Sequence, residues 1–250
     1  MKAHIERRYA TTFDHPGPRL REYVLAMKAM FRAFRREEKP AFAGEFFRFD
    51  LLPDMWSPGP IDVPDPPIYV AGVNPWMLRM CGEVADGLHV HPLNTRRYVD
   101  EVILPSVAEG AARAGRDRSE ISIACPVFTI VGDTDEEQEQ WRREARFQIG
   151  FYGSTRTYRK IFELHGWDDT PARLHELQAA GDLEGLAAAV TDEMLDEFAI
   201  TSTWDGLADA IRARYDGVAD QVIAYFSMRG WAGDPGQLER WSAVAHAING

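Results

Sequence analysis

The stretch PPIYVAGVNPWMLRMCGEVADGLHVHPLN, residues 66–94, is the clearest indication of the fold class. It predicts a short apolar strand at 66–72, a helix at 76–84 and a second strand at 87–92, because the apolar residues change from consecutive to helical spacing and back. Two strands joined by a helix of this length pair in parallel through a right-handed crossover. This stretch therefore predicts an α/β fold.

The same alternation continues toward the C-terminus. The expected elements are a helix at 96–114, a strand at 121–132, a helix behind Thr134-Asp135-Glu136-Glu137, a helix at 204–215 and a strand at 219–226. Thr134 fits a capping box, as do Ser202 and Asp205 before the later helix. Residues 151–200 are expected to be helical without a strand, and we interpret them as an insertion within one domain, 1–250.

The N-terminal part begins with an expected helix at 19–35, after Pro16-Gly17-Pro18. A hairpin is expected over FAGEFFRFDLL, residues 42–52, and a proline-rich loop over 53–67. The whole chain thus offers four convincing parallel strands, whereas a closed parallel barrel needs eight. The strands belong either to an open doubly wound sheet or to part of a barrel.

The amino-acid composition disfavours two classes of binding partner, nucleic acids and membranes. Lys and Arg number 28 against 39 Asp and Glu, a net charge of −11 that disfavours binding of nucleic acid. The sequence contains neither a long apolar run nor a signal-peptide pattern, so we expect a cytoplasmic protein without a membrane partner. Cys81 and Cys125 lack CxxC spacing and are expected to be small buried residues.

The first candidate site follows the strand at 66–72. The strand ends at Ala71-Gly72, and Val73-Asn74-Pro75 then leads into a helix. The backbone N–H groups of a helix N-terminus can bind a phosphate. An ordinary strand-to-helix turn is the alternative interpretation.

The second candidate site follows the next strand. His89 and His91 alternate, so they point to the same side of the strand. A metal site would need a third ligand, and none stands at a fixed spacing, so we expect no metal. Stacking on a ring or hydrogen bonding to a phosphate is favoured for His91, with a structural histidine as the alternative.

Other motifs add little. The run HIERRY, residues 4–9, has the pattern of a solvated charged face. The sequence contains no Walker A motif, no GxGxxG after a strand, no GxSxG and no HExxH, which disfavours kinases and the common hydrolases.

Five motifs together resemble a known family. FAGEFFRFD, PPIYVAG, ADGLHVHP, VGDTDEE and TDEMLDEFAITSTWDGLADAI are similar, in this order, to the C-terminal part of the luciferase-like monooxygenases, over about residues 2–226. HIERRY and NPWMLRM are most similar to the branch that depends on a deazaflavin, coenzyme F420. The resemblance implies a TIM-barrel-type (β/α)8 fold of which this chain supplies strands five to eight, and a longer protein whose first four strands precede it.

The resemblance also implies a function. It implies an oxidoreductase that transfers a hydride between coenzyme F420 and a small organic substrate, with an FMN-dependent monooxygenase as the alternative. It places the cofactor's phosphate at Gly72, Val73 and Asn74, with His91 beside it and His4 near the ring, and it carries over no catalytic residue. A non-catalytic fragment or partner-binding half barrel is the alternative from another class, since open strand edges favour pairing with another chain, including a homo-oligomer.

Overall fold

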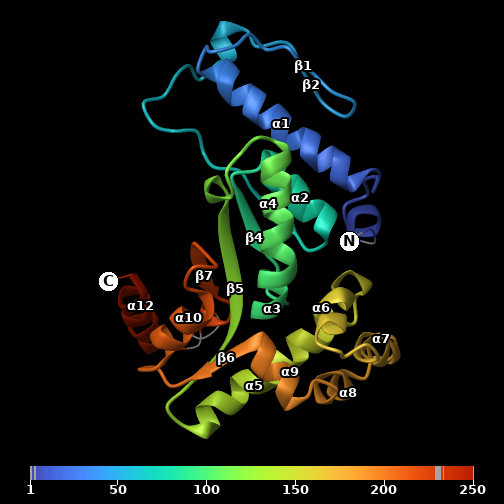
Figure 1. Ribbon diagram of the computed structural model, residues 1–250, viewed down its shortest axis with the longest axis vertical. Helices are drawn as coiled ribbons and strands as arrows, with labels where there is room; N and C mark the ends of the chain where they lie inside the picture. The colour runs from blue at the N-terminus through green and yellow to red at the C-terminus, as the bar shows by residue number, and fades with distance from the viewer. Residues whose placement is uncertain (1, 3, 229–231, 233, 250) are drawn as a thin grey trace. The chain divides into compact units, whose positions relative to one another are not determined.

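The computed structural model describes residues 2, 4–228, 232 and 234–249 (Figure 1). The chain divides into two compact units. The first unit comprises Met1–Val70, Trp76–Gly87 and Ser106–Ile121, and the second comprises Ala71–Pro75, Leu88–Pro105 and Ser122–Gly250.

The first unit begins with a π-helical turn, η1 (His4–Arg8), and a long helix, α1 (Pro16–Phe34). The expected hairpin is confirmed, since β1 (Phe42–Ala43) and β2 (Arg48–Phe49) pair antiparallel. The carboxylate of Glu22 in α1 accepts hydrogen bonds from three backbone N–H groups of the hairpin turn. The donors are Glu45 at 2.9 Å, Phe46 at 2.7 Å and Phe47 at 2.7 Å. A single carboxylate thereby fixes the hairpin against α1. The following loop contains one short helical turn, η2 (Asp54–Trp56).

Two glycines let the helices of this unit pack backbone against backbone. They lie in α2 (Pro75–Val84) and α4 (Leu104–Arg113). A Cβ atom on Gly82 would lie 2.1 Å from the carbonyl oxygen of Val107, and one on Gly110 would lie 1.9 Å from that of Arg79. Neither position has room for a side chain, because the obstructing atoms belong to the main chain.

The sheet lies mostly in the second unit. Its strands are β3 (Tyr69–Gly72), β4 (Gly87–Val90), β5 (Ser122–Val131), β6 (Ala199–Ser202) and β7 (Gln221–Ala224). Their order is β3-β4-β5-β6, with β7 also paired to β5. The N-terminal half of β5 pairs with β7 and its C-terminal half with β6, both in parallel. The α/β class is confirmed, and the strands of the described residues form an open path.

One element contradicts the sequence analysis. Residues 199–202, expected to lie at the end of a helical region and in a helix cap, form the strand β6, in register Phe128↔Ala199 with β5. Ser202 ends this strand, and α10 (Leu207–Tyr215) starts later, behind Gly206, without a side-chain cap. The predicted Ser202/Asp205 capping box is therefore wrong. Four residues directly after a helix carry little strand signal, and their pairing with β5 decides their conformation.

The other helices agree with expectation in type and differ in detail. The expected helix at 96–114 is divided into α3 (Arg96–Tyr98), a π-helical turn η3 (Val99–Ile103) and α4. A short turn, η4 (Arg118–Glu120), precedes β5. Thr134 caps α5 (Asp135–Gly153) by accepting the N–H of Glu137, as predicted. The remaining helices are η5 (Arg156–Tyr158), α6 (Arg159–Leu164), α7 (Thr170–Ala180), α8 (Leu183–Ala188), α9 (Asp192–Phe198) and α12 (Gly236–Asn249).

The core of the second unit is built around β5, which is buried from Ile123 to Val131. Phe128 of this strand stacks on Phe226, which follows β7.

Cys81 and Cys125 are both buried, as expected, and burial raises the pKa of each thiol to about 12. No helix in the described part of the chain combines the length and the apolar composition that crossing a bilayer requires.

Candidate functional site

Two loops that follow neighbouring strands contain most of the predicted site. The first loop, 72–75, leaves β3, and the second, 91–95, leaves β4, which is next to β3 in the sheet. In the first loop Gly72 is buried and Asn74 is exposed. Ligands of open α/β sheets bind outside the carboxyl ends of the strands, which is where both loops lie.

His91 is held as a neutral imidazole. Its Nδ1 accepts the backbone N–H of Leu93 at 3.1 Å, so we assign the ring proton to Nε2. Burial, followed by the charge of nearby His89, lowers the pKa of His91 to about 4. At neutral pH the residue therefore presents one hydrogen-bond donor, Nε2–H.

The ring of His91 lies against two tyrosines. Tyr158 is 4.4 Å away between ring centroids in a tilted arrangement, and Tyr152 is 4.7 Å away, edge to face. Burial, followed by the nearby Tyr225, raises the pKa of Tyr158 to about 12. The hydroxyl groups of Tyr152 and Tyr225 are 2.7 Å apart. Because tyrosines already pack on His91, a hydrogen bond from its Nε2–H fits a ligand better than stacking does.

Residues 94–98, which follow His91, connect the two loops through hydrogen bonds. Asn94 is 3% exposed, and its Nδ2 donates to the carbonyl oxygens of His91 at 2.8 Å and Pro126 at 3.0 Å. Thr95 accepts the N–H of Tyr98 at 3.1 Å. The Tyr98 hydroxyl donates to the carbonyl oxygen of Val73 at 3.0 Å. A hydrogen bond from Tyr98 of α3, directly after the second loop, thus reaches the first loop.

The two loops combine hydrogen-bond donors with the absence of negative charge, a combination compatible with an anion such as phosphate. Loop 72–75 and loop 91–95 contain no acidic residue. A neutral imidazole N–H and the amide groups of Asn74 are hydrogen-bond donors without an opposing carboxylate in the same loops. In the described part of the chain, no three His, Cys, Asp or Glu side chains are arranged to hold a metal ion.

The structure places the predicted residues in two groups. Gly72, Val73, Asn74 and His91 belong to the second unit, and Val73 accepts a hydrogen bond from Tyr98, which follows the loop of His91. His4 is exposed on η1 in the first unit, so its role near a ring stays a prediction.

Sequence reasoning missed the supporting side chains. Asn94 and Thr95 carried a weak signal, since small polar residues directly after a strand often bond the backbone of the turn. Tyr98, Tyr152 and Tyr158 gave no signal, because a tyrosine at helical spacing is usually a core residue.

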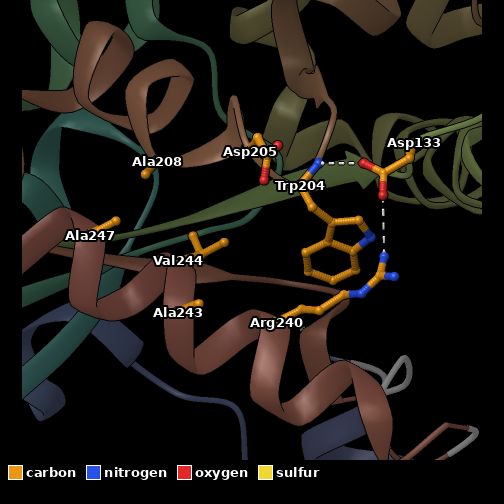
Figure 2. A pocket seen from close by; sticks show the side chains of 8 residues that line it. All are labelled: Asp133, Trp204, Asp205, Ala208, Arg240, Ala243, Val244 and Ala247. Atoms are coloured by element: carbon orange, nitrogen blue, oxygen red, sulfur yellow. Dashed lines mark hydrogen bonds and ion pairs between the residues drawn. The ribbon is translucent and has the colours of Figure 1, made fainter.

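A separate pocket of about 400 Å³ lies beyond β5 and β6 (Figure 2). In Figure 2, Asp133 bridges the backbone N–H of Trp204 at 3.2 Å and the guanidinium of Arg240 at 3.4 Å. The same guanidinium lies over the Trp204 ring, 5.4 Å from its centroid. These charges satisfy one another and tie α12 to the ends of the strands, so we assign the pocket a structural role.

Comparison with known proteins identifies relatives of this chain. A protein of Mycobacterium tuberculosis described as uncharacterized is 40% identical over 226 residues, which are 90% of this chain and 66% of that protein. A 5,10-methylenetetrahydromethanopterin reductase of Archaeoglobus fulgidus is 28% identical over 224 residues, or 87% of this chain and 62% of that protein. The chain thus spans slightly less than two thirds of the length of these relatives.

A solved structure agrees in fold. The coenzyme F420 dependent tetrahydromethanopterin reductase from Methanopyrus kandleri superposes with a TM-score of 0.62 at 20% sequence identity, covering 81% of this chain and 56% of that one. At this identity the likeness concerns the fold alone. The family model described as luciferase-like monooxygenase matches residues 1–221. The chain therefore belongs to the luciferase-like monooxygenase family.

Proposed function

We propose that this chain is the phosphate-binding part of a coenzyme F420-dependent oxidoreductase. The observation that supports it best is the neutral, oriented His91, whose Nε2–H donor lies in the loop joined by Tyr98 to the acid-free loop 72–75. Gly72, Val73 and Asn74 would hold the phosphate from one side and His91 from the other. His4 is retained as a residue near the ring.

The bound deazaflavin would supply the hydride chemistry, and the protein would supply orientation and electrostatics. The substrate class is a small organic molecule that gives or accepts a hydride. Coenzyme F420 is favoured over FMN because HIERRY, residues 4–9, and NPWMLRM, residues 74–80, resemble the deazaflavin-dependent branch of the family. The FMN-dependent monooxygenase is the alternative within the family.

A cofactor titration tests the proposal. Coenzyme F420 and FMN are added separately to the full chain, and binding is followed by the fluorescence of the cofactor. The matched variants are His91→Phe, which keeps a ring against the tyrosines without a donor, and Tyr23→Phe, which removes a hydroxyl from α1. We expect coenzyme F420 to bind more tightly than FMN, with a loss of affinity in His91→Phe only.

Two other outcomes of the titration would favour a different function. Tighter binding of FMN would favour the monooxygenase alternative. Binding of neither cofactor would contradict the proposal and favour a fragment that associates with another protein.

A further inference from the structure

One hydroxyl group connects the second loop to the helical segment 151–200. Thr95, 1% exposed, is the N-cap of α3, and its Oγ1 accepts the backbone N–H of Tyr98 at 3.1 Å. The same oxygen lies 2.8 Å from Nε2 of His165, which follows α6 and is 70 positions away in the sequence. Both residues belong to the second unit. A single side chain therefore holds the first turn of α3 and contacts the end of α6.

The contact between Thr95 and His165 has a definite direction. A threonine hydroxyl has one hydrogen to donate and two lone pairs that accept. One lone pair accepts the Tyr98 N–H, and among the described residues the one acceptor that contacts the hydroxyl is Nε2 of His165. A buried donor without an acceptor is costly, so we assign the donated hydrogen to Thr95. Neutral His165 then carries its ring proton on Nδ1.

Protonation of His165 reverses this hydrogen bond. An imidazolium carries a hydrogen on both nitrogens, so Nε2 then donates to Thr95 Oγ1, and the Thr95 hydroxyl loses its acceptor. The imidazole stacks on the ring of Trp167, with 4.6 Å between centroids and 13° between planes. The ring cannot turn Nε2 away from Thr95 without giving up this contact. Protonation therefore favours separation of the two side chains.

Charged groups from two neighbouring segments act on the His165 ring. Burial is the largest effect and lowers the pKa of His165 below its ordinary value of 6.5. Glu197 and Glu193 of α9 raise this pKa. Glu101 of η3 also raises it, whereas Arg97 of α3 lowers it. The balance keeps the ring neutral at pH 7 and lets it accept a proton at a more acidic pH than an exposed histidine.

We propose that the Thr95–His165 hydrogen bond is a pH-sensitive link between loop 91–95 and α6, closed while His165 is neutral and opened by its protonation. Opening loosens the first turn of α3, directly after the loop that contains His91. The link involves no ligand, so it does not depend on the proposed function.

An NMR titration of the full wild-type chain, from neutral pH into the acid range, tests the link. Nitrogen shifts of the imidazole report the tautomer and the protonation of His165. Amide exchange of Tyr98, divided by the rate of an unstructured peptide at the same pH, reports the first turn of α3. We expect the Nδ1–H tautomer at neutral pH and about fivefold lower protection of the Tyr98 amide once His165 is protonated, the loss of one hydrogen bond.

Two substitutions alter the link itself. Thr95→Val removes the donor, so neutral His165 loses a hydrogen bond and its pKa should rise toward the ordinary value, whereas Thr95→Ser keeps the hydroxyl and should retain the wild-type titration. His165→Phe keeps a ring against Trp167 but cannot titrate, so the protection of the Tyr98 amide should no longer change with pH.

Two further variants serve as controls. His175→Phe removes an exposed histidine of α7 in the same unit and should leave the response of Tyr98 unchanged. His91→Phe removes the other imidazole near this turn and should also retain the response. An Nε2–H tautomer at neutral pH in wild type would overturn the proposal, because Thr95 would then not be the donor. Protection of the Tyr98 amide that is constant while His165 titrates, or that is lost with His91 instead, would overturn it as well.

Discussion

At the scale of single residues, the candidate site depends on the burial and orientation of a few hydrogen-bonding groups rather than on their number. His91 would be an ordinary histidine in water, but burial and the N–H of Leu93 make it a neutral donor. Asn94 is a short polar residue whose amide stabilises two carbonyl groups in the protein interior. Both residues act through hydrogen bonds that are costly to leave unmade when buried.

The pKa of His91 predicts how stability depends on pH. The folded-state pKa, about 4, lies below the ordinary value of 6.5, so between these values the unfolded chain binds a proton that the folded chain does not. The free energy of unfolding should therefore fall as pH decreases through this window, by at most about 3 kcal/mol from this residue. Urea unfolding of wild type and His91→Phe, measured at several pH values from 7 to 4, would show it as a shallower pH dependence in the variant. Parallel curves would contradict the assignment.

Asn74 allows a test of charge at the proposed phosphate-binding loop. We expect Asn74→Asp to weaken coenzyme F420 binding more than Asn74→Ala does. The carboxylate repels a phosphate, whereas alanine removes at most one hydrogen bond, a net loss of about 1 kcal/mol. Dissociation constants of the two variants and wild type decide the matter, and three equal values would show that the loop does not contact the phosphate.

At the scale of elements, the close approach of α2 and α4 fixes the frame of the first unit. Gly110→Ala should lower stability by about 1 to 3 kcal/mol, although alanine favours a helix, because the added methyl group meets the Arg79 carbonyl. Gly206→Ala is the control, since its nearest obstruction is the movable hydroxyl of Ser202. Thermal unfolding of both variants provides the measurement. A rise in midpoint for Gly110→Ala would show that the two helices can move apart without cost.

At the scale of the whole molecule, the sheet of the described residues is open and the relatives are longer than this chain. In the proposed function these two loops hold the phosphate end of the cofactor, and the reacting ring needs contacts on further sides. Holding the reacting atoms in near-attack geometry lowers the activation free energy by about 7 to 11 kcal/mol in favourable cases. A deazaflavin ring that is held only through the phosphate end of the cofactor would lose most of this gain.

We therefore expect the 250-residue chain by itself to bind coenzyme F420 weakly and to turn over no substrate detectably. Steady-state assays with reduced and oxidised cofactor, on monomeric protein isolated by size exclusion, provide the measurement. The reference is a longer protein that carries this chain and matches the length of its relatives. Turnover by the 250-residue chain within about tenfold of that reference would overturn the expectation and show that these strands make a complete site.

Local sequence was sufficient to predict the alternation of strands and helices, the hairpin at 42–52, the cap at Thr134 and the positions of the two loops. These features follow from local periodicity and from residues that bond their own turn. The tertiary structure was needed to establish that 199–202 is a strand, that His91 is neutral and that Tyr98 contacts Val73. Each of these depends on groups brought together from distant parts of the chain, and no local pattern encodes such burial and pairing.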